Sequence, residues 1–221
     1  MSAVHLAIVG LLGYFLGGIP TAYLAGRAAG VDIRRHGSGN VGGTNAVRVL
    51  GWKRALPVMV VDVGKGYVAA WLLPKLPLSG LDPVYLALAG GAGAVLGHVF
   101  SPFLRLRGGK GVAAGAGMLL ALIPVPVGIC AALFALVVLG SGIVSLGSLS
   151  AAAALPAVTF LYGEAHPAVR WLTVALAAFV FWTHRSNLRR LLAGKENRFP
   201  RPWERRRPTR ADGDRKRRPR R

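Results

Sequence analysis

The sequence contains a single cysteine and few acidic residues. Among its 221 residues, Cys130 carries the one thiol, and 8 Asp and Glu stand against 28 Lys and Arg. One cysteine excludes an intramolecular disulfide framework and any metal cluster built from several thiolates. Cys130 lies in an apolar run, so we expect it to be a buried core residue. We expect neither a metal nor a cofactor.

Long stretches of the chain also lack charge, although the formal net charge is +20 and 53% of the residues are apolar. The charges are collected in blocks between these stretches. A hydrocarbon layer roughly 30 Å thick requires about 20 consecutive apolar residues of a helix, and several runs approach that length. A soluble domain would spread its charge along every element. The pattern therefore indicates an all-α integral membrane protein.

The basic excess does not indicate a protein that binds nucleic acid. Of the 28 Lys and Arg residues, 16 lie beyond His184, and no folded basic module surrounds them. Residues 199–221 are rich in Arg and Pro, which predicts a disordered tail after a membrane domain at 1–198. We expect the tail to be attracted to anionic headgroups of the lipid bilayer, with a specific partner as the alternative.

Seven apolar segments are predicted to cross the membrane: 4–26, 55–74, 83–101, 112–123, 126–141, 144–162 and 168–183. Asp82 and Pro83 are a typical N-cap and first helical residue, and Pro124 marks another boundary. The first segment lacks the cationic start of a cleavable signal peptide, so we expect it to be retained. The fourth segment is short for a straight span. This leaves a tilted, broken or protein-covered helix, or a six-span topology, as alternatives.

The distribution of basic residues predicts the orientation. Seven transmembrane helices place the connections 27–54 and 102–111 and the C-terminal tail on one side, together with most of the Lys and Arg residues. Cytoplasmic loops carry such an excess, whereas six spans would put the two basic connections on opposite sides. We therefore expect an outer N-terminus and a cytoplasmic C-terminus in the cell inner (plasma) membrane, with Gly-rich loops on the cytoplasmic side.

The first Gly-rich loop runs from Gly37 to Asn45 and contains four glycines in seven residues. Glycine allows positive φ, so successive backbone N–H groups can turn toward one anion. Arg48 follows and adds a planar guanidinium suited to phosphate oxygens. The loop indicates a phosphate site, with a flexible interhelical connection as the alternative. Its candidate residues are Ser38, Gly39, Asn40, Thr44, Asn45 and Arg48.

The second Gly-rich loop is Arg107–Gly111, directly before the fourth apolar segment. It resembles half of a nucleotide-binding P-loop, but it lacks the spacing of that motif and the Ser or Thr after the lysine. A nucleoside triphosphatase is therefore not indicated. Gly108, Gly109 and Lys110 beside a helix N-terminus still suit a phosphate. A basic turn at the membrane surface is the alternative.

Four further polar residues lie near the predicted cytoplasmic surface. His184 and Asn187 follow the last apolar segment, where a histidine can be merely interfacial and an asparagine can cap a helix. His98 and Ser145 lie at segment ends near the same surface. Each of these residues is a weak indication when taken alone.

The second apolar segment contains two ionisable residues. Asp62 and Lys65 are one helical turn apart, so their side chains can pair on one face. Ionisable groups at that depth usually face a polar cavity or one another. The residues therefore indicate either a structural pair or part of a site.

Four polar runs resemble, in order and spacing, the bacterial acyl-phosphate:glycerol-3-phosphate acyltransferases, the PlsY family. The runs are GSGNVGGTNAVRVLG at 37–51, DVGKG at 62–66, GHVFSPFLRLRGGKGVA at 97–113 and HRSNLRRLLAGKENRF at 184–199. The resemblance covers about residues 5–199. It departs from the family pattern at Gly43, where alanine is usual, at Ser101, where proline is frequent, and at Ser186, where glutamate is common.

The resemblance implies the first acylation of phospholipid biosynthesis, in which acyl phosphate and glycerol 3-phosphate give lysophosphatidic acid and inorganic phosphate. It also implies seven membrane helices. The residues that it implies for the active site are Ser38, Arg48, Lys110, His184 and Asn187. The positions that we add for substrate binding are Gly39, Asn40, Thr44, Asn45, His98, Gly108, Gly109 and Ser145, of which Thr44 and Asn45 would shape the first loop.

The chemistry of the implied reaction suits these residues. Acyl phosphate has a good leaving group, so we expect positioning and charge stabilisation by Arg48 and Lys110 to carry the rate. His184, or an oxygen of the acyl phosphate, would take the hydroxyl proton. None of the five histidines has Asp five positions later, which argues against the His-x4-Asp acyltransferases that use acyl thioesters.

A transporter for an anionic metabolite is the alternative function, since Gly-rich broken segments and intramembrane charge also occur in transporters. The short and nearly uncharged outer connections favour the acyltransferase. We expect a monomer.

Overall fold

The computed structural model describes residues 2–76, 82–163 and 165–199. Within these ranges the chain is helical and contains no β-strand. The α-helices are α1 (Ser2–Gly18), α2 (Thr21–Ala28), α3 (Gly43–Leu50), α4 (Trp52–Trp71), α5 (Pro83–Val99), α6 (Val112–Leu122), α7 (Pro124–Ser141), α8 (Val144–Tyr162), α9 (Pro167–Thr183) and α10 (Arg185–Leu192). Short 3₁₀ turns lie at Ile33–Arg35, Leu73–Lys75 and Pro102–Leu104. The predicted tail lies outside the described residues, apart from Phe199.

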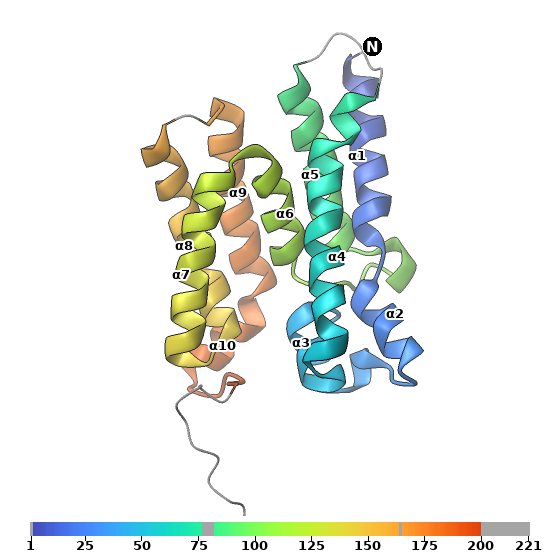
Figure 1. The fold of residues 1–221 in the computed structure, drawn as a ribbon, viewed down its shortest axis with the longest axis vertical. Helices are drawn as coiled ribbons and strands as arrows, with labels where there is room; N and C mark the ends of the chain where they lie inside the picture. Colours follow the sequence, from blue (N-terminus) through green and yellow to red (C-terminus); the bar gives the residue numbers. More distant parts are fainter. Residues whose placement is uncertain (1, 77–81, 164, 200–221) are drawn as a thin grey trace, which may run out of the picture.

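The apolar segments form helices that run side by side along the long axis of the molecule (Figure 1). Five helical stretches have the length and hydropathy of membrane spans, and α6 and α9 are shorter apolar helices. These observations confirm the all-helical membrane class. The short polar helices α2, α3 and α10 lie at the lower end in this view, opposite the N-terminus.

The first apolar segment, predicted as one stretch over 4–26, is divided into two helices. α1 ends at Gly18 and α2 begins at Thr21, with Ile19 and Pro20 between them. Proline lacks the N–H that a continuous helix requires, and it disfavours the α conformation in the residue before it. The Ile19 carbonyl at this break accepts a hydrogen bond from Lys65 Nζ at 3.2 Å.

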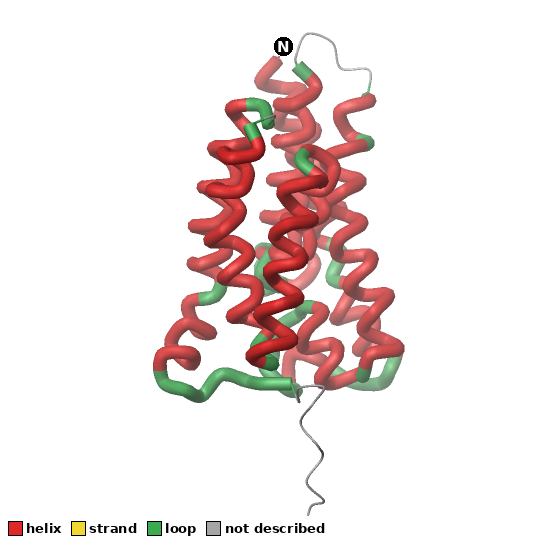
Figure 2. The backbone as a smooth tube through the Cα atoms, turned by 60° about the vertical axis from the view of Figure 1, so that its left-hand side comes forward, coloured by secondary structure: helices red, strands yellow, loops and turns green. Residues whose placement is uncertain are grey.

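Helix α6 explains the short fourth segment. Its 11 residues extend about 17 Å, roughly half the thickness of a hydrocarbon layer. The chain enters α6 partway along the long axis, where loops cross the interior of the molecule (Figures 1 and 2). The structure therefore favours a half-length helix, with the second Gly-rich loop in place of the missing half.

Glycines allow neighbouring helices to approach closely. α1 packs on α5, and α4 packs on α6. A Cβ atom on Gly97 would lie 2.0 Å from the carbonyl oxygen of Tyr14, and one on Gly66 would lie 1.9 Å from that of Ala114. Any larger residue would therefore push the helices apart. Small residues at helix crossings are typical of membrane proteins, in which close packing drives helix association.

Two buried apolar clusters hold the helices together. The first is centred on α6, which lies between α4 and α5 on one side and α7 to α9 on the other, and it includes Met118 and Cys130. Cys130 is buried, as predicted. The second cluster joins α2, α3 and α4 at the lower end and includes Val41 of the first Gly-rich loop. The same cluster includes Leu104, which lies shortly before the second Gly-rich loop.

Candidate active site

The second Gly-rich loop is pinned to the end of α5. The N–H groups of Gly108 and Gly109 donate to the carbonyl oxygens of Val99 and His98, both at 2.9 Å. The hydrogen bonds of these two amides are therefore used to fix the loop to α5. Thr183 Oγ1 donates to the Lys110 carbonyl at 3.1 Å, which ties the loop to the end of α9.

The first Gly-rich loop is closed by Asn45, which is fully buried. Asn45 Nδ2 donates to the carbonyl oxygens of Ile33 and His36, both at 3.1 Å, and Asn45 Oδ1 accepts from the Ser38 N–H at 2.9 Å. Asn45 therefore shapes the loop through its side chain. Gly37 and Gly39 adopt positive φ on either side of Ser38, and they leave Ser38 on the exposed side of the loop.

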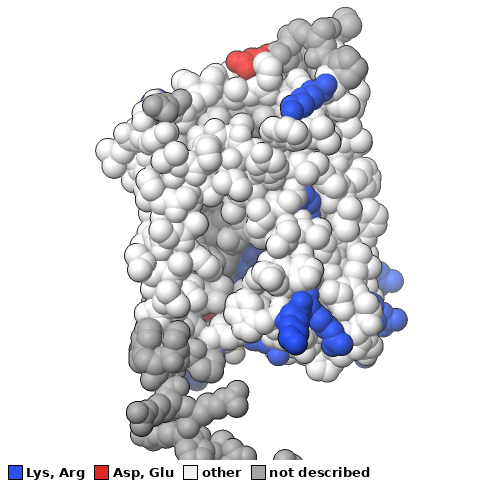
Figure 3. Space-filling view, in the orientation of Figure 1, with Lys and Arg blue, Asp and Glu red and all other residues white. Residues whose placement is uncertain are grey.

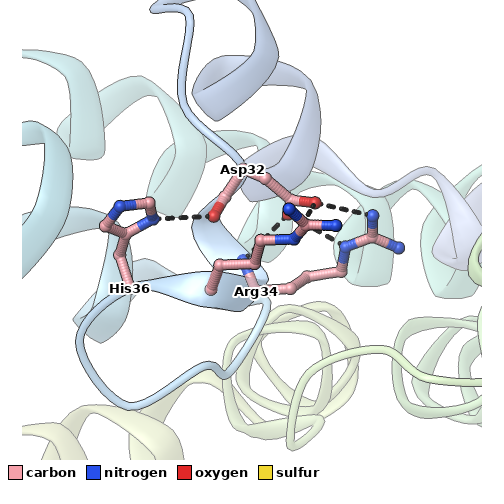
Figure 4. Close-up of polar contacts among 4 residues, drawn as sticks. Asp32, Arg34 and His36 are labelled. Atoms are coloured by element: carbon pink, nitrogen blue, oxygen red, sulfur yellow. Dashed lines mark hydrogen bonds and ion pairs between the residues drawn. The ribbon is translucent and has the colours of Figure 1, made fainter.

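The segment before the first loop is braced by Asp32 (Figure 4). Its carboxylate accepts hydrogen bonds from the Arg34 backbone N–H at 3.1 Å and from the Arg34 guanidinium at 2.9 and 2.8 Å. The Asp32 carbonyl lies 3.0 Å from His36 Nδ1. The Arg34 hydrogen bonds hold the pKa of Asp32 well below its usual value. This cluster orders the turn that carries the two carbonyl acceptors of Asn45.

A chain of hydrogen bonds joins the second loop to α10 and α8. Lys110 Nζ donates to Asn187 Oδ1, and Asn187 Nδ2 donates to Glu196 Oε1 at 2.7 Å. Ser145 Oγ donates to the same Glu196 oxygen at 3.1 Å, and Arg190 Nε donates to Glu196 Oε2 at 2.7 Å. Because both ends of the Asn187 amide are bound, its orientation is set by its neighbours.

Arg48 approaches this chain from α3. Its guanidinium lies over the ring of Phe199, 5.0 Å from the ring centroid. Phe199 packs on the cluster of α2, α3 and α4, and its N–H donates to the Gly142 carbonyl at 2.8 Å. The segment from Glu196 to Phe199 therefore bridges the two halves of the molecule.

The cationic groups of the site influence one another. Burial lowers the pKa of Lys110 to about 8, with Arg190 and Arg48 acting in the same direction and Glu196 opposing them. Burial also lowers the pKa of Arg48, which still remains protonated. Burial raises the pKa of Glu196, but hydrogen bonds from Arg190, Asn187 and Ser145 outweigh that effect and leave it below its usual value. One carboxylate thus stands among three cations.

His184 lies at the junction of α9 and α10 and is 3% exposed. Its Nδ1 lies 2.8 Å from the Val180 carbonyl oxygen, which selects the tautomer that carries its proton on Nδ1. Burial and the nearby Lys110 charge lower the pKa of His184 to about 4. The imidazole is therefore neutral at pH 7, with its lone pair on Nε2.

A cavity of about 290 Å³ lies where three of the four polar runs meet, and Asn40, Gly108, Gly109, Lys110, Thr183 and Arg185 are among its lining residues. Figure 3 shows a hollow in the lower half of the molecule with cationic surface in its wall. Phe100 and Trp182 also line the cavity, with their ring centroids 6.0 Å apart. The cavity thus combines phosphate-binding groups with an aromatic wall.

The structure brings many of the predicted site residues together. Lys110, Asn187 and Ser145 belong to one hydrogen-bonded chain. Arg48 and His184 lie close enough to Glu196 of this chain to interact with its charge. Asn40, Gly108 and Gly109 line the cavity. Ser38, Gly39, Thr44 and Asn45 lie in the first loop, and His98 lies beneath the second loop. None of these five lines the cavity, and neither do Arg48, Ser145, His184 and Asn187.

Sequence reasoning gave no role to Glu196 or Arg190. Glu196 is the one acidic residue between His184 and Phe199, in a strongly basic stretch. A single acidic residue among so many basic ones could have indicated a specific role for Glu196. Within the described ranges, no three His, Cys, Asp or Glu side chains lie together in a way that could hold a metal ion.

The chain is similar to known acyltransferases over most of its length. The family described as "Glycerol-3-phosphate acyltransferase" matches residues 7–194. A glycerol-3-phosphate acyltransferase of Chlorobium phaeobacteroides (strain BS1) is 40% identical and covers 87% of this chain and 96% of its own. One of Salinibacter ruber (strain DSM 13855 / M31) is 43% identical, with 88% and 92% covered.

Two crystal structures share the fold. The glycerol 3-phosphate form of PlsY, an integral membrane glycerol 3-phosphate acyltransferase, has a TM-score of 0.80 at 31% identity and covers 88% of this chain and 96% of its own. The lysophosphatidic acid form has a TM-score of 0.79 at 31% identity, with 88% and 95% covered.

Proposed function

We propose that this chain transfers a fatty acyl group from acyl phosphate to the sn-1 hydroxyl of glycerol 3-phosphate. The chain belongs to the glycerol-3-phosphate acyltransferase family. The products are lysophosphatidic acid and inorganic phosphate, and the reaction is the first step of phospholipid biosynthesis. The observation that carries the proposal is the hydrogen-bonded chain from Lys110 through Asn187 to Glu196, beside a cationic cavity. It joins two distant motifs at a site suited to phosphate.

We further propose seven membrane spans, with the N-terminus outside and the site facing the cytoplasm of the inner (plasma) membrane. The support is that α1 with α2, then α4 to α9, supply seven apolar helical stretches. In the view of Figure 3, the Lys and Arg surface gathers toward the end that holds α2, α3 and α10. On this topology the basic tail meets anionic lipid of the inner leaflet.

In the proposed reaction, Lys110 in the cavity wall and Arg48 near it supply the positive charge that holds the substrate phosphates. The hydroxyl oxygen attacks the acyl carbonyl carbon, and the bond from that carbon to the phosphate oxygen breaks. Lys110 is largely protonated at pH 7, since its pKa is about 8, and it neutralises charge on the departing phosphate. Fixed cations that need no reorganisation are expected to be the main source of the rate.

The cavity volume indicates where the acyl chain goes. A cavity of about 290 Å³ lies at the lower end of the range for small-ligand sites and is filled by the polar ends of the substrates. Phe100, Phe179 and Trp182 form an aromatic group, with Phe179 and Trp182 stacked at 5.6 Å between centroids. We propose that the chain passes this group into the surrounding lipid.

The donor assay tests the proposal directly. Purified protein in lipid nanodiscs receives glycerol 3-phosphate with acyl phosphate, acyl-CoA or acyl carrier protein in turn. We expect lysophosphatidic acid and an equal amount of inorganic phosphate with acyl phosphate alone. Turnover with either thioester and none with acyl phosphate would overturn the donor assignment.

Two acceptors fit the hydroxyl proton, His184 Nε2 and an oxygen of the acyl phosphate. A histidine base is lost as the pH falls through its pKa, which the negative substrates raise from the value of about 4 in the free protein. His184→Gln would then remove an acid limb from the pH–rate profile. An unchanged profile assigns the proton to the phosphate oxygen.

A further inference from the structure

A buried polar network on α2, α4 and α5 has no part in the chemistry above. Asp62 is 1% exposed, Lys65 is 5% exposed and His98 is 7% exposed. Asp62 Oδ1 accepts a hydrogen bond from Thr21 Oγ1 at 2.5 Å, and it lies 2.9 Å from Lys65 Nζ and 3.7 Å from His98 Nδ1. Ionisable groups inside a membrane protein are costly and usually serve a function. Stability alone is a poor reason for the pair, because apolar residues often replace a buried ion pair without loss.

His98 connects this network to the second Gly-rich loop. Its carbonyl oxygen accepts the Gly109 N–H at 2.9 Å. Its ring lies against the same glycine, since a Cβ atom on Gly109 would be 2.2 Å from His98 Nε2. That Cβ atom would also lie 2.9 Å from the Val41 carbonyl oxygen of the first loop. Gly109 is therefore wedged between the His98 ring and the first loop, and Lys110 is the next residue.

The rest of the network is attached to the break between α1 and α2. Lys65 Nζ donates to the Ile19 carbonyl at 3.2 Å, and Ser101 Oγ donates to the Gly18 carbonyl at 2.6 Å. A cavity of about 10 Å³ remains among Asp62, Lys65, His98 and Gly109, room for at most one water molecule. The groups beneath the loop have little freedom, so a change in one of them displaces Gly109.

We propose that Thr21, Asp62, Lys65 and His98 are positioning residues, which hold the second Gly-rich loop where Lys110 reaches a substrate phosphate. The inference rests on the proposed function. Thr21 and Lys65 fix the Asp62 carboxylate, Asp62 fixes the His98 ring, and the ring sets the position of Gly109. A displacement of about 1 Å at a catalytic group can reduce a rate on the order of 100-fold, so a support of this kind has a large effect.

The test compares two threonines, the half-buried Thr21 and the fully buried Thr159. Thr21→Val removes the hydroxyl that binds Asp62 and preserves the side-chain volume. Thr159→Val is the control, because Thr159 is fully buried in α8 and its hydroxyl donates to the Leu155 carbonyl of its own helix at 2.8 Å. We measure KM for each phosphorylated substrate, kcat, and inhibition by inorganic phosphate.

We expect Thr21→Val to raise KM for at least one phosphorylated substrate, and the inhibition constant of inorganic phosphate, by about tenfold. Thr159→Val should leave both constants within twofold, and Thr21→Ser, which retains the hydroxyl, should restore them. A smaller folded fraction lowers the apparent kcat but changes neither constant. Wild-type values of KM and of the phosphate inhibition constant in Thr21→Val would overturn the proposal.

A second variant keeps the test decisive if Thr21→Val does not fold. The double variant Asp62→Asn, Lys65→Met removes both charges together and leaves no uncompensated buried charge. It should raise the same two constants, and wild-type values in it would overturn the proposal. Absence of product from acyl phosphate with the wild-type protein would refute the proposed function instead, so the two failures are distinguishable.

Discussion

Each Gly-rich loop lies close to one cation of the site, since Lys110 belongs to the second loop and Arg48 follows the first loop in α3, but the two loops are held in place differently. The first loop lies near the polar end of the molecule and is closed by the neutral amide of Asn45. The second loop lies deeper, is pinned to α5 by backbone hydrogen bonds, and rests on buried charged groups. Both supports are buried, since Asn45 is fully buried and Asp62 is 1% exposed, so their polar contacts strengthen where water is excluded. The two supports therefore differ in charge and not in burial.

The largest effect is expected from the cation of the deeper loop. Lys110→Ala removes the group that would stabilise the departing phosphate, and loss of one such group costs on the order of 10² to 10³ in kcat/KM. Lys53→Ala is the control, since Lys53 is an exposed lysine at the start of α4. Thermal unfolding of both variants checks that the fold is intact. Near wild-type turnover in Lys110→Ala would remove Lys110 from the site.

The sequence predicts the helices and the convergence of the loops better than the depth of each part. Apolar runs and charge blocks locate the apolar helices, and the motif resemblance brings Lys110 and Asn187 into one site. A composition argument does not reveal that α6 stops halfway, because 11 apolar residues fit a tilted, covered or broken helix equally well. Glu196 escaped notice because it lies beyond α10 in an irregular segment, where no helical spacing links it to its partners.

A weaker effect is expected from the support of the first loop. Asn45→Ala removes one of the two hydrogen bonds that each of the Ile33 and His36 carbonyls accepts, and a lost hydrogen bond costs about 0.5 to 1.5 kcal/mol. We expect a lower unfolding temperature in detergent and a several-fold lower kcat/KM. Asn197→Ala, at an exposed position, should change neither. Undiminished stability in Asn45→Ala would show that the first loop does not depend on this amide, and the comparison of the two supports would fail.

The last effect is expected from pH, and it separates the two cations. Lys110 has a pKa of about 8 because burial disfavours its charge, so its ammonium is lost as the pH rises through that value. Arg48 keeps its charge in the same range. Phosphate monoesters have a second pKa of about 6 and are already dianionic there, so the substrate does not contribute a second limb. KM for glycerol 3-phosphate should therefore rise by up to about tenfold per pH unit above pH 8.

In Lys110→Arg the rise should disappear, since the guanidinium does not titrate, even if the variant binds less tightly overall. If KM rises equally in Lys110→Arg, a different group titrates, and Lys110 is not the pH-sensitive cation.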